Sequence, residues 1–478
     1  MHRRFAALLL LCALSLGPCA LAQIQVSAAP PSPQFDWGKL NAEATEWLAG
    51  LLRINTTNPP GNELEAAKYL AAILEKEGIR AEVIESVPGR GIVVARLSSG
   101  AIPDPSRALL LLGHTDVVGV DRGKWTADPF GAEIKNGYLY GRGALDMKGM
   151  VIANLAVMVA LKRQGTALNR DVIFLAAGDE EAGGVHGIEF AIEKHWTKIA
   201  AGFAINEGGR VLVKDGKVQY VGVQAAEKVP VTVTVIASGV SGHASVPRKD
   251  NPVVRLAAAV AKIGAYEAQA RPTTIVRRYF EKLATIEDQE IAKWMRALDT
   301  ERETQAIRRI SEANPVWNAM LRNTIAVTML NGGFRANVVP SEAQATLNVR
   351  LLPGELIGSL IEELKKIVND PQVRFEVAPR GRTPSPPSAI DTELYAAFER
   401  AGAEAFPGAV VLPLMSTWAT DSAQLRVRNV QCYGIIPFPL TAEEESRMHA
   451  DDERIPIASF HKGIEFLYRV VHPFVRAM

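Results

Sequence analysis

Two adjacent carboxylates, Glu180 and Glu181, follow an apolar run and precede a short glycine-rich stretch. The run at 172–177 is typical of a buried strand, which would deliver both side chains to a loop at the strand's end. Adjacent glutamates at a strand end rarely serve packing, although acidic loops are usually just solvated. They make chemical sense if one binds a metal ion and the other transfers a proton.

Other residues of suitable chemistry are spread along the chain: His114, Asp146, Glu207 and His449. Taken singly, each has an ordinary explanation, because histidines are often structural and carboxylates often lie on solvated turns. Together with Glu181 they match a site for two zinc ions about 3.5–4 Å apart, with a bridging carboxylate and one or two further N or O ligands per ion. This joint match favours a metal site over five separate coincidences.

The charges of this set suit such a site. Two Zn²⁺ ions and three carboxylates together have one unit of positive charge. A bound hydroxide would neutralise that remaining charge. Metal binding lowers the pKa of water towards about 7, so that hydroxide is the predicted nucleophile. Glu180 is then spare, and it would take the proton of the attacking water and pass it to the leaving nitrogen. Asp116, two residues after His114, would orient the imidazole.

The elements that must position these residues alternate between strands and helices. Apolar runs at 108–112, 172–177 and 203–205 predict strands, and helical patterns lie between them. This alternation favours an α/β fold with a mostly parallel sheet covered on both faces. In such sheets sites form beyond the C-terminal strand ends, where the histidine and glutamate candidates of this half of the chain fall.

The pattern changes near residue 229. Alternating apolar and polar residues then predict half-buried antiparallel strands in the order strand–helix–strand–strand–helix–strand, a small α+β domain. A long, largely helical insertion at 266–322 interrupts it. We therefore predict a catalytic domain built from 37–228 and 382–478, with the α+β domain inserted at 229–381. The segment at 443–445 is expected to be an acidic loop.

The N-terminus has the pattern of an export signal. Residues 1–22 combine two arginines, an apolar core too short for a membrane span, and a small-x-small site before Gln23. Residues 23–36 read as a flexible tail. The protein is thus expected to be exported, periplasmic or secreted; an uncleaved or lipid anchor at Cys19 is the alternative. Cys12 and Cys19 leave with the signal, so Cys432 would be alone, buried and inert.

Composition excludes several functions. The formal net charge is +1 and 48% of the residues are hydrophobic. No basic excess points to nucleic acid, and no acidic excess points to disorder. The chain reads as a soluble globular protein, and 478 residues are enough for two domains.

The segments 113–118, 125–130, 140–149 and 179–181 resemble the dizinc exopeptidases and amidohydrolases. This family includes glutamate carboxypeptidase, carboxypeptidase S, aminoacylase and succinyl-diaminopimelate desuccinylase. The resemblance runs from about residue 37 to the C-terminus and is sparse in the insertion. It implies a catalytic domain plus a lid, or dimerisation, domain.

The resemblance also implies roles. Asp146 would bridge the metals, and Glu180 would be the general base. The remaining ligands would divide into one pair for each zinc: His114 with Glu207, and Glu181 with His449. Relatives often carry Asp-Glu-Gly where this chain has Asn206-Glu207-Gly208, so only Glu207 can be the anionic ligand there.

Three residues of the inserted domain match substrate-binding positions of the family: His243, Asn337 and Arg350. In relatives the histidine helps to stabilise the oxyanion, often in the site of a partner subunit. This role implies a homodimer that forms through the lid. The insertion at 266–322 is a departure from the family that bears on this dimer. Arg350 lies on the polar face of its predicted strand, where a guanidinium suits a substrate carboxylate. An exposed strand charge is the competing interpretation.

These observations predict a zinc metallopeptidase or amidohydrolase that cleaves an amide bond next to a free carboxylate. Its substrate would be a peptide or N-acyl amino acid, and cobalt or manganese would suit the same ligands as zinc. An aminopeptidase of the same superfamily is the nearest alternative. A non-catalytic exported metal-binding protein and a deacetylase of sugars or polyamines are the others. Because Trp418-Ala419 stands where many relatives have glycines, the family's specificity cannot be copied.

Overall fold

The computed structural model describes residues 35–379, 381–382 and 384–477. The predicted signal peptide, Cys12, Cys19 and nearly all of the predicted tail lie outside the described residues. Residues Trp37–Met478 cluster into one unit. Within the described ranges, no helix combines the length and the apolar character that crossing a membrane requires.

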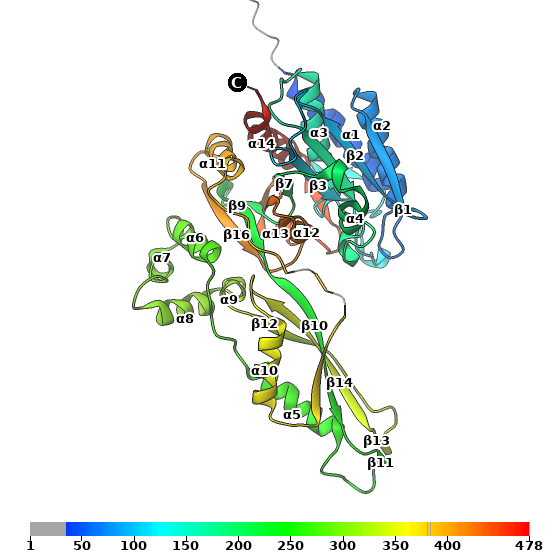
Figure 1. The fold of residues 1–478 in the computed structure, drawn as a ribbon, viewed down its shortest axis with the longest axis vertical. Helices are drawn as coiled ribbons and strands as arrows, with labels where there is room; N and C mark the ends of the chain where they lie inside the picture. Colours follow the sequence, from blue (N-terminus) through cyan, green and yellow to red (C-terminus); the bar gives the residue numbers. More distant parts are fainter. Residues whose placement is uncertain (1–34, 380, 383, 478) are drawn as a thin grey trace, which may run out of the picture. The chain divides into compact units, whose positions relative to one another are not determined.

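The strands that carry the candidate ligands lie side by side in a large sheet (Figure 1). Among the described residues this sheet has ten strands, in the order β1-β2-β6-β3-β7-β17-β9-β8-β18, with β16 paired to β9. Its central strands are parallel: β6 (Val172–Ala177), β3 (Leu109–His114), β7 (Phe203–Asn206) and β17 (Gln431–Gly434). The predicted α/β fold with a mostly parallel sheet is confirmed, and the C-terminal ends of β6, β3 and β7 meet at one edge.

The margins of this sheet are mixed in direction. Antiparallel pairs join β1 to β2, β2 to β6 and β8 to β9. By contrast, β16 pairs with β9 and β18 pairs with β8 in the parallel direction. The marginal strands are β1 (Ala81–Val87), β2 (Arg90–Leu97), β8 (Arg210–Lys214), β9 (Lys217–Glu227), β16 (Val410–Ser416) and β18 (Pro439–Thr441).

Helices cover both faces of the sheet, as the continuous apolar strands require. Leu110 and Leu112 of β3 pack in one core cluster with α4 (Ile188–Ile199). The alternate residues of β3 face α3 (Lys148–Arg163), where a Cβ on Gly113 would lie 2.8 Å from the Val151 side chain. A glycine at 113 thus lets a helix that is buried on all sides approach closely.

The remaining helices of this part complete the layers. α1 (Trp37–Arg53) and α14 (Ile457–Val475) pack against α3, and α2 (Glu63–Lys76) packs on β1 and β2. α11 (Glu393–Ala405) contacts α14 and β16, and α12 (Ser422–Val427) contacts β17. Cys432 of β17 is buried, as expected, and burial raises the pKa of its thiol to about 11.

A second sheet holds the residues after 228. Its four described strands, in the order β12-β14-β10-β15, are all antiparallel. They are β12 (Thr324–Gly332), β14 (Glu342–Leu351), β10 (Val229–Ser238) and β15 (Val373–Val377). α5 (Pro252–Ala265) and α10 (Ile357–Val368) share a core cluster with the sheet's buried face. The order of these elements along the chain agrees with the predicted α+β domain, which is called the lid below; its boundaries stay a prediction.

The insertion at 266–322 is helical, as predicted. Its helices are α6 (Thr274–Leu283), α7 (Gln289–Met295), α8 (Glu303–Ala313) and α9 (Pro315–Leu321). α6 packs against β16 of the large sheet. The buried Lys228, between β9 and β10, donates hydrogen bonds to the carbonyls of Ala319 and Arg322 at 3.0 and 2.9 Å. The insertion is therefore anchored at the point where the chain enters the lid.

Three short strands form a further small sheet: β19 (Arg454–Pro456), β5 (Tyr138–Tyr140) and β4 (Ile134–Lys135). The prediction of an acidic loop at 443–445 is wrong, because these residues lie in the helical turn α13 (Ala442–Glu445). A capping box explains the helix: the Thr441 hydroxyl accepts from the Glu444 amide, and the Glu444 carboxylate accepts from the Thr441 amide.

Candidate metal centre

The strand ends bring the predicted ligands together. His114 is the last residue of β3, and Glu207 directly follows β7. Glu180 and Glu181 begin a short 3₁₀ turn after β6, and their loop starts at Asp179 in the left-handed conformation (φ 68°). Because β3 lies between β6 and β7, side chains from distant parts of the chain meet at one edge of the sheet.

Among the described residues, two groups of side chains could hold a metal ion, and they share Asp146. The first group is His114, Asp146 and Glu207. His114 Nε2 lies 3.2 Å from Asp146 Oδ1 and 3.7 Å from Glu207 Oε1. All three side chains are largely buried, so their charges are poorly screened by solvent.

The second group is Asp146, Glu181 and His449. His449 Nε2 lies 3.1 Å from Asp146 Oδ2 and 3.1 Å from Glu181 Oε1. Each oxygen of Asp146 therefore faces a different group, as a bridging carboxylate requires. His449 is in the left-handed conformation (φ 62°), and its carbonyl accepts a hydrogen bond from Arg142 at 3.2 Å. Backbone in this rare conformation is typical of functional positions.

The chemistry of the donors fits divalent ions. Two imidazoles and three carboxylates form a set that zinc prefers. Hydrogen bonds to Asp146 and Glu181 raise the pKa of His449 to about 10. Burial opposes the charge on Asp146, but hydrogen bonds from His114 and His449 hold its pKa well below the usual range. A site that stabilises positive charge this strongly is electrostatically suited to a cation.

Glu180 belongs to neither group. Its side chain is buried, and burial raises the pKa of its carboxyl to about 8 despite the nearby Arg382 and His114. Arg382 Nη2 donates to Glu180 Oε1 at 2.5 Å. No local pattern singles out Arg382, which precedes a proline-rich run. Its partner Glu180 lies 202 residues away along the chain.

Asp116 connects two of the strand ends. Its carboxylate accepts hydrogen bonds from the main-chain amides of Glu180 and Glu181, each at 3.1 Å. His114 Nδ1 lies 3.0 Å from the main-chain oxygen of Asp116 and 3.4 Å from its carboxylate Oδ1. Asp116 is thus placed to orient the imidazole, mostly through its main chain, and its carboxylate holds the glutamate loop.

Glu453 supports Asp146 in a similar way. Its fully buried carboxylate accepts from Arg142 at 2.7 Å and from three main-chain amides, those of Gly143, Leu145 and Asp146. Sequence reasoning missed this role, because Glu453 stands in a run of acidic residues that looked like a solvated surface. No local pattern distinguishes it from its neighbours.

None of the predicted lid residues belongs to the two groups. His243 is exposed in the two-stranded ribbon of β11 (Gly242–His243) and β13 (Val338–Val339), where its Nδ1 lies 2.7 Å from the Ser245 hydroxyl. Asn337 lies beside it, since its carbonyl accepts from the Ala244 amide at 3.0 Å. Arg350 is on the polar face of β14, as predicted, and pairs in register with Pro230 and Thr324.

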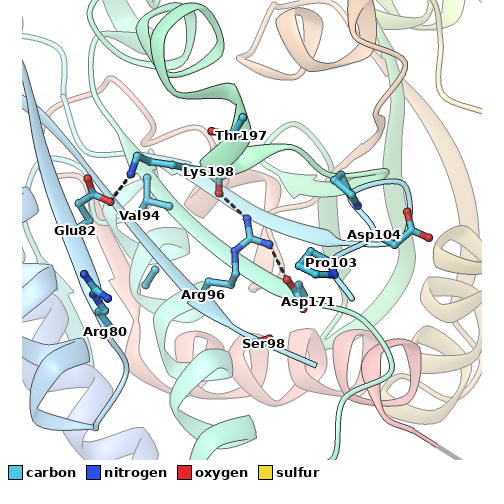
Figure 2. A pocket seen from close by; sticks show the side chains of 12 residues that line it. Arg80, Glu82, Val94, Arg96, Ser98, Pro103, Asp104, Asp171, Thr197 and Lys198 are labelled. Carbon is cyan, nitrogen blue, oxygen red and sulfur yellow. Dashed lines mark hydrogen bonds and ion pairs between the residues drawn. The ribbon is translucent and has the colours of Figure 1, made fainter. Parts of the chain in front are cut away.

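A surface pocket of about 470 Å³ lies elsewhere, around β1, β2 and the end of α4 (Figure 2). Its charged side chains largely satisfy one another: Arg96 pairs with Asp171 at 2.8 Å, and Lys198 pairs with Glu82 at 2.7 Å. None of its lining residues belongs to the two groups described above. It offers no comparable chemistry.

The fold and the clustered ligands define a hydrolase of the metallopeptidase class. A family model described as "Peptidase family M20/M25/M40" matches residues 110–472. The chain belongs to this family, which confirms the resemblance and the enzyme class that were predicted from the motifs.

Known relatives share most of the chain. The probable carboxypeptidase S-like 2 of Dictyostelium discoideum is 29% identical, over 76% of this chain and 71% of its own. The N-fatty-acyl-amino acid synthase/hydrolase PM20D1 of Xenopus tropicalis is 30% identical, with the same coverage. The crystal structure of the M20 family metallo-carboxypeptidase Sso-CP2 from Sulfolobus solfataricus has a TM-score of 0.68 at 23% identity, covering 90% of this chain and 99% of that one. This last likeness concerns the fold.

Proposed function

We propose that this protein hydrolyses an amide bond next to a free carboxylate, as a carboxypeptidase, dipeptidase or N-acyl-amino-acid amidohydrolase. The observation that carries the proposal is a pair of ligand groups sharing Asp146, with one carboxylate, Glu180, left over beside them. Zinc is the ion that this donor set prefers, and cobalt or manganese suit the same ligands.

The roles of the residues follow from their places. When bound, two ions would activate a water molecule and polarise the amide carbonyl. Their ligands would be His114, Glu207, Glu181 and His449, with Asp146 between the ions. Glu180 accepts the proton of the attacking water and passes it to the leaving nitrogen. Asp116 keeps the His114 ring in its orientation.

Arg350 is the proposed receptor of the substrate carboxylate. Among the described residues its side chain donates one hydrogen bond, to Asn348 at 3.0 Å, and forms no ion pair. It is half-buried, and burial lowers the pKa of the guanidinium. A partly buried guanidinium with no acid beside it is well suited to grip a carboxylate with two hydrogen bonds.

Replacing Arg350 with Ala is expected to raise KM for carboxylate substrates by about 10- to 100-fold, the cost of losing charge-assisted hydrogen bonds. The kcat should change little, because the carboxylate is bound equally in the ground and transition states. Steady-state kinetics with an N-acyl amino acid would measure both. The matched control is Arg374→Ala, another lid arginine, which already pairs with Glu342 and Glu376. An unchanged KM in Arg350→Ala would make Arg350 an ordinary surface charge.

An aminopeptidase is the second candidate, since the same metal chemistry serves both. Arg350 favours carboxylate recognition, and the carboxypeptidase and N-acyl-amino acid hydrolase names among the relatives agree with it. A non-catalytic metal-binding protein is disfavoured, because Glu180 has no ligand role to explain it. Metal-loaded protein should be screened against dipeptides, N-acyl amino acids and their C-terminal amides. Cleavage of amides as fast as free acids would favour the aminopeptidase.

A homodimer through the lid is proposed from two observations. Arg350 is eight residues from Glu342 along β14, about 26 Å at the rise of a strand, and the His243–Asn337 ribbon lies beyond the Glu342 end. A dipeptide-sized substrate cannot span that distance, so a second copy would supply His243 and Asn337. In addition, β12 is an edge strand with Met329 and Leu330 exposed at 66% and 64%, a surface typical of strand pairing between copies.

Replacing Leu330 with Asp is expected to shift the protein from dimer to monomer in analytical ultracentrifugation, because a buried charge would be left at the pairing edge. Ile102→Asp is the control, since Ile102 is 93% exposed on another part of the chain. A wild-type protein that sediments as a monomer at micromolar concentration would contradict the proposal.

Export is proposed from the N-terminal pattern alone. Sequencing the N-terminus of protein from the producing cells tests it. A mature chain that begins at Gln23 supports cleavage and a periplasmic or secreted location. A chain that retains Met1 argues against cleavage, and one with a lipid on Cys19 would replace cleavage before Gln23 by a lipid anchor.

A further inference from the structure

Arg382 connects the segment that returns from the lid to the proposed base. It lies between β15 and α11, and its side chain is only 13% exposed. Its Nη2 donates to both Glu180 Oε1 and the Glu180 main-chain oxygen at 2.5 Å. Its Nη1 donates to Asp421 Oδ1 at 3.2 Å. One guanidinium thus serves two buried carboxylates that come from different elements.

The surroundings make this contact hard to replace. Asp421 is 1% exposed. Among the described residues, its second oxygen has no hydrogen-bond partner, and neither amide atom of the nearby Gln424 has one. A Cβ on Gly184 would lie 3.2 Å from Asp421 Oδ1 and 3.6 Å from Gln424 Nε2. The cluster is therefore packed against the glycine turn that follows Glu180 and Glu181. Without Arg382, two carboxylates would be buried there without a positive partner, which is costly.

The two carboxylate oxygens of Glu180 differ in their hydrogen bonds. Oε1 is held by Arg382, whereas Oε2 has no hydrogen bond among the described residues and is not fully buried. Because Glu180 belongs to neither ligand group, Oε2 is the oxygen left to take a proton. The competing role for Arg382 is to bind the substrate carboxylate. Arg350 suits that role better, since it has no acid partner in the described part of the chain, whereas Arg382 already has two.

We propose that Arg382 is a positioning residue, which fixes Glu180 through Oε1 and its main chain and so aims Oε2 at the reacting water. The inference rests on the proposed function, because it gives Glu180 the part of the base. It assigns to Arg382 no contact with the substrate or the metal ligands.

Replacing Arg382 with Ala is expected to lower kcat by about tenfold or more, part of the 10²–10⁴ that a positioned base supplies, and to leave KM within about threefold. Added guanidinium ions should restore part of the kcat, because the substitution leaves a cavity of their shape. Bound metal, measured by elemental analysis, should stay at the wild-type level. The control is Arg96→Ala, which removes another arginine–carboxylate ion pair, with Asp171 at 2.8 Å, in the pocket of Figure 2.

Several results would overturn the proposal. A raised KM with unchanged kcat would make Arg382 a substrate ligand. A loss of kcat that guanidinium does not restore, accompanied by a lower Tm, would make its role merely structural. A double-mutant cycle is independent of catalysis: the Tm shifts of Arg382→Ala and Glu180→Gln should be non-additive, and additive shifts would refute the pairing. If the wild-type protein cleaves no substrate, the proposed function is refuted. If the wild type is active and Arg382→Ala has the same kcat, only the positioning role is refuted.

Discussion

Replacing Glu180 with Gln is expected to lower kcat by about 10²–10⁴-fold, because the amide keeps the shape of the side chain but cannot accept a proton. The bound metal should be unaffected, since Glu180 is in neither ligand group. KM should change little, as the base acts only in the transition state. Single-turnover kinetics on protein of known metal content would separate the loss of chemistry from a loss of binding.

The neighbouring residue supplies a sharp control for this experiment. Glu181→Gln changes the same chemical group one position along the chain, but Glu181 Oε1 faces His449 Nε2 at 3.1 Å within a ligand group. This variant is therefore expected to lose metal as well as activity. If Glu180→Gln instead lost metal, or kept its kcat within about tenfold of wild type, the assignment of the base to Glu180 would fail.

The strand-borne part of the site was predictable because its signals are local. Continuous apolar runs before His114 and Glu180 identify buried parallel strands, and parallel strands place their C-terminal residues at one edge. The strands of the lid were predictable for a related reason. In β14, apolar and polar residues alternate because one face of the strand is buried and the other is exposed or half-buried. In both cases a short window of sequence contains the physical cause of the structure.

Marginal strands were harder to predict from sequence. β9 is buried along most of its length without an alternating pattern, and β18 has only three residues. Their place depends on partners far along the chain, such as β16 beside β9. The acidic residues at 443–445 are typical of a solvated loop, but the capping contact between Thr441 and Glu444 stabilises a helical turn there.

There is a physical reason why the sequence did not predict the residues that support the site. Arg382 pairs with Glu180, and Glu453 pairs with Arg142, each more than 200 positions away in sequence. A single charged residue has no periodicity, and its neighbours do not indicate whether it will be buried. His449 lies in an irregular loop as well, and only the resemblance, not a strand pattern, assigned it to a particular ion.

Replacing Asp146 with Asn is expected to remove at least one of the two metal ions per chain. Asp146 is the residue shared by both groups, and each of its oxygens faces a different histidine, at 3.2 and 3.1 Å. An amide keeps one of these oxygens, turns the other into a donor that cannot bind a cation, and removes a negative charge. Changing a residue that only supports a ligand costs about 10- to 100-fold in metal affinity, so this change should cost more.

Metal stoichiometry from elemental analysis and thermal unfolding with and without zinc would test this expectation. Ions that bind only the folded protein stabilise it by about 2.7 kcal/mol at a hundred times their Kd, so Asp146→Asn should lose most of the zinc-dependent rise in Tm. Asp128→Asn is the control, because Asp128 is an exposed aspartate that forms an ion pair with the exposed Arg122 at 3.0 Å and belongs to neither ligand group. Retention of two tightly bound ions by Asp146→Asn would show that the two groups do not depend on a shared carboxylate, and the dinuclear arrangement proposed for this protein would have to be abandoned.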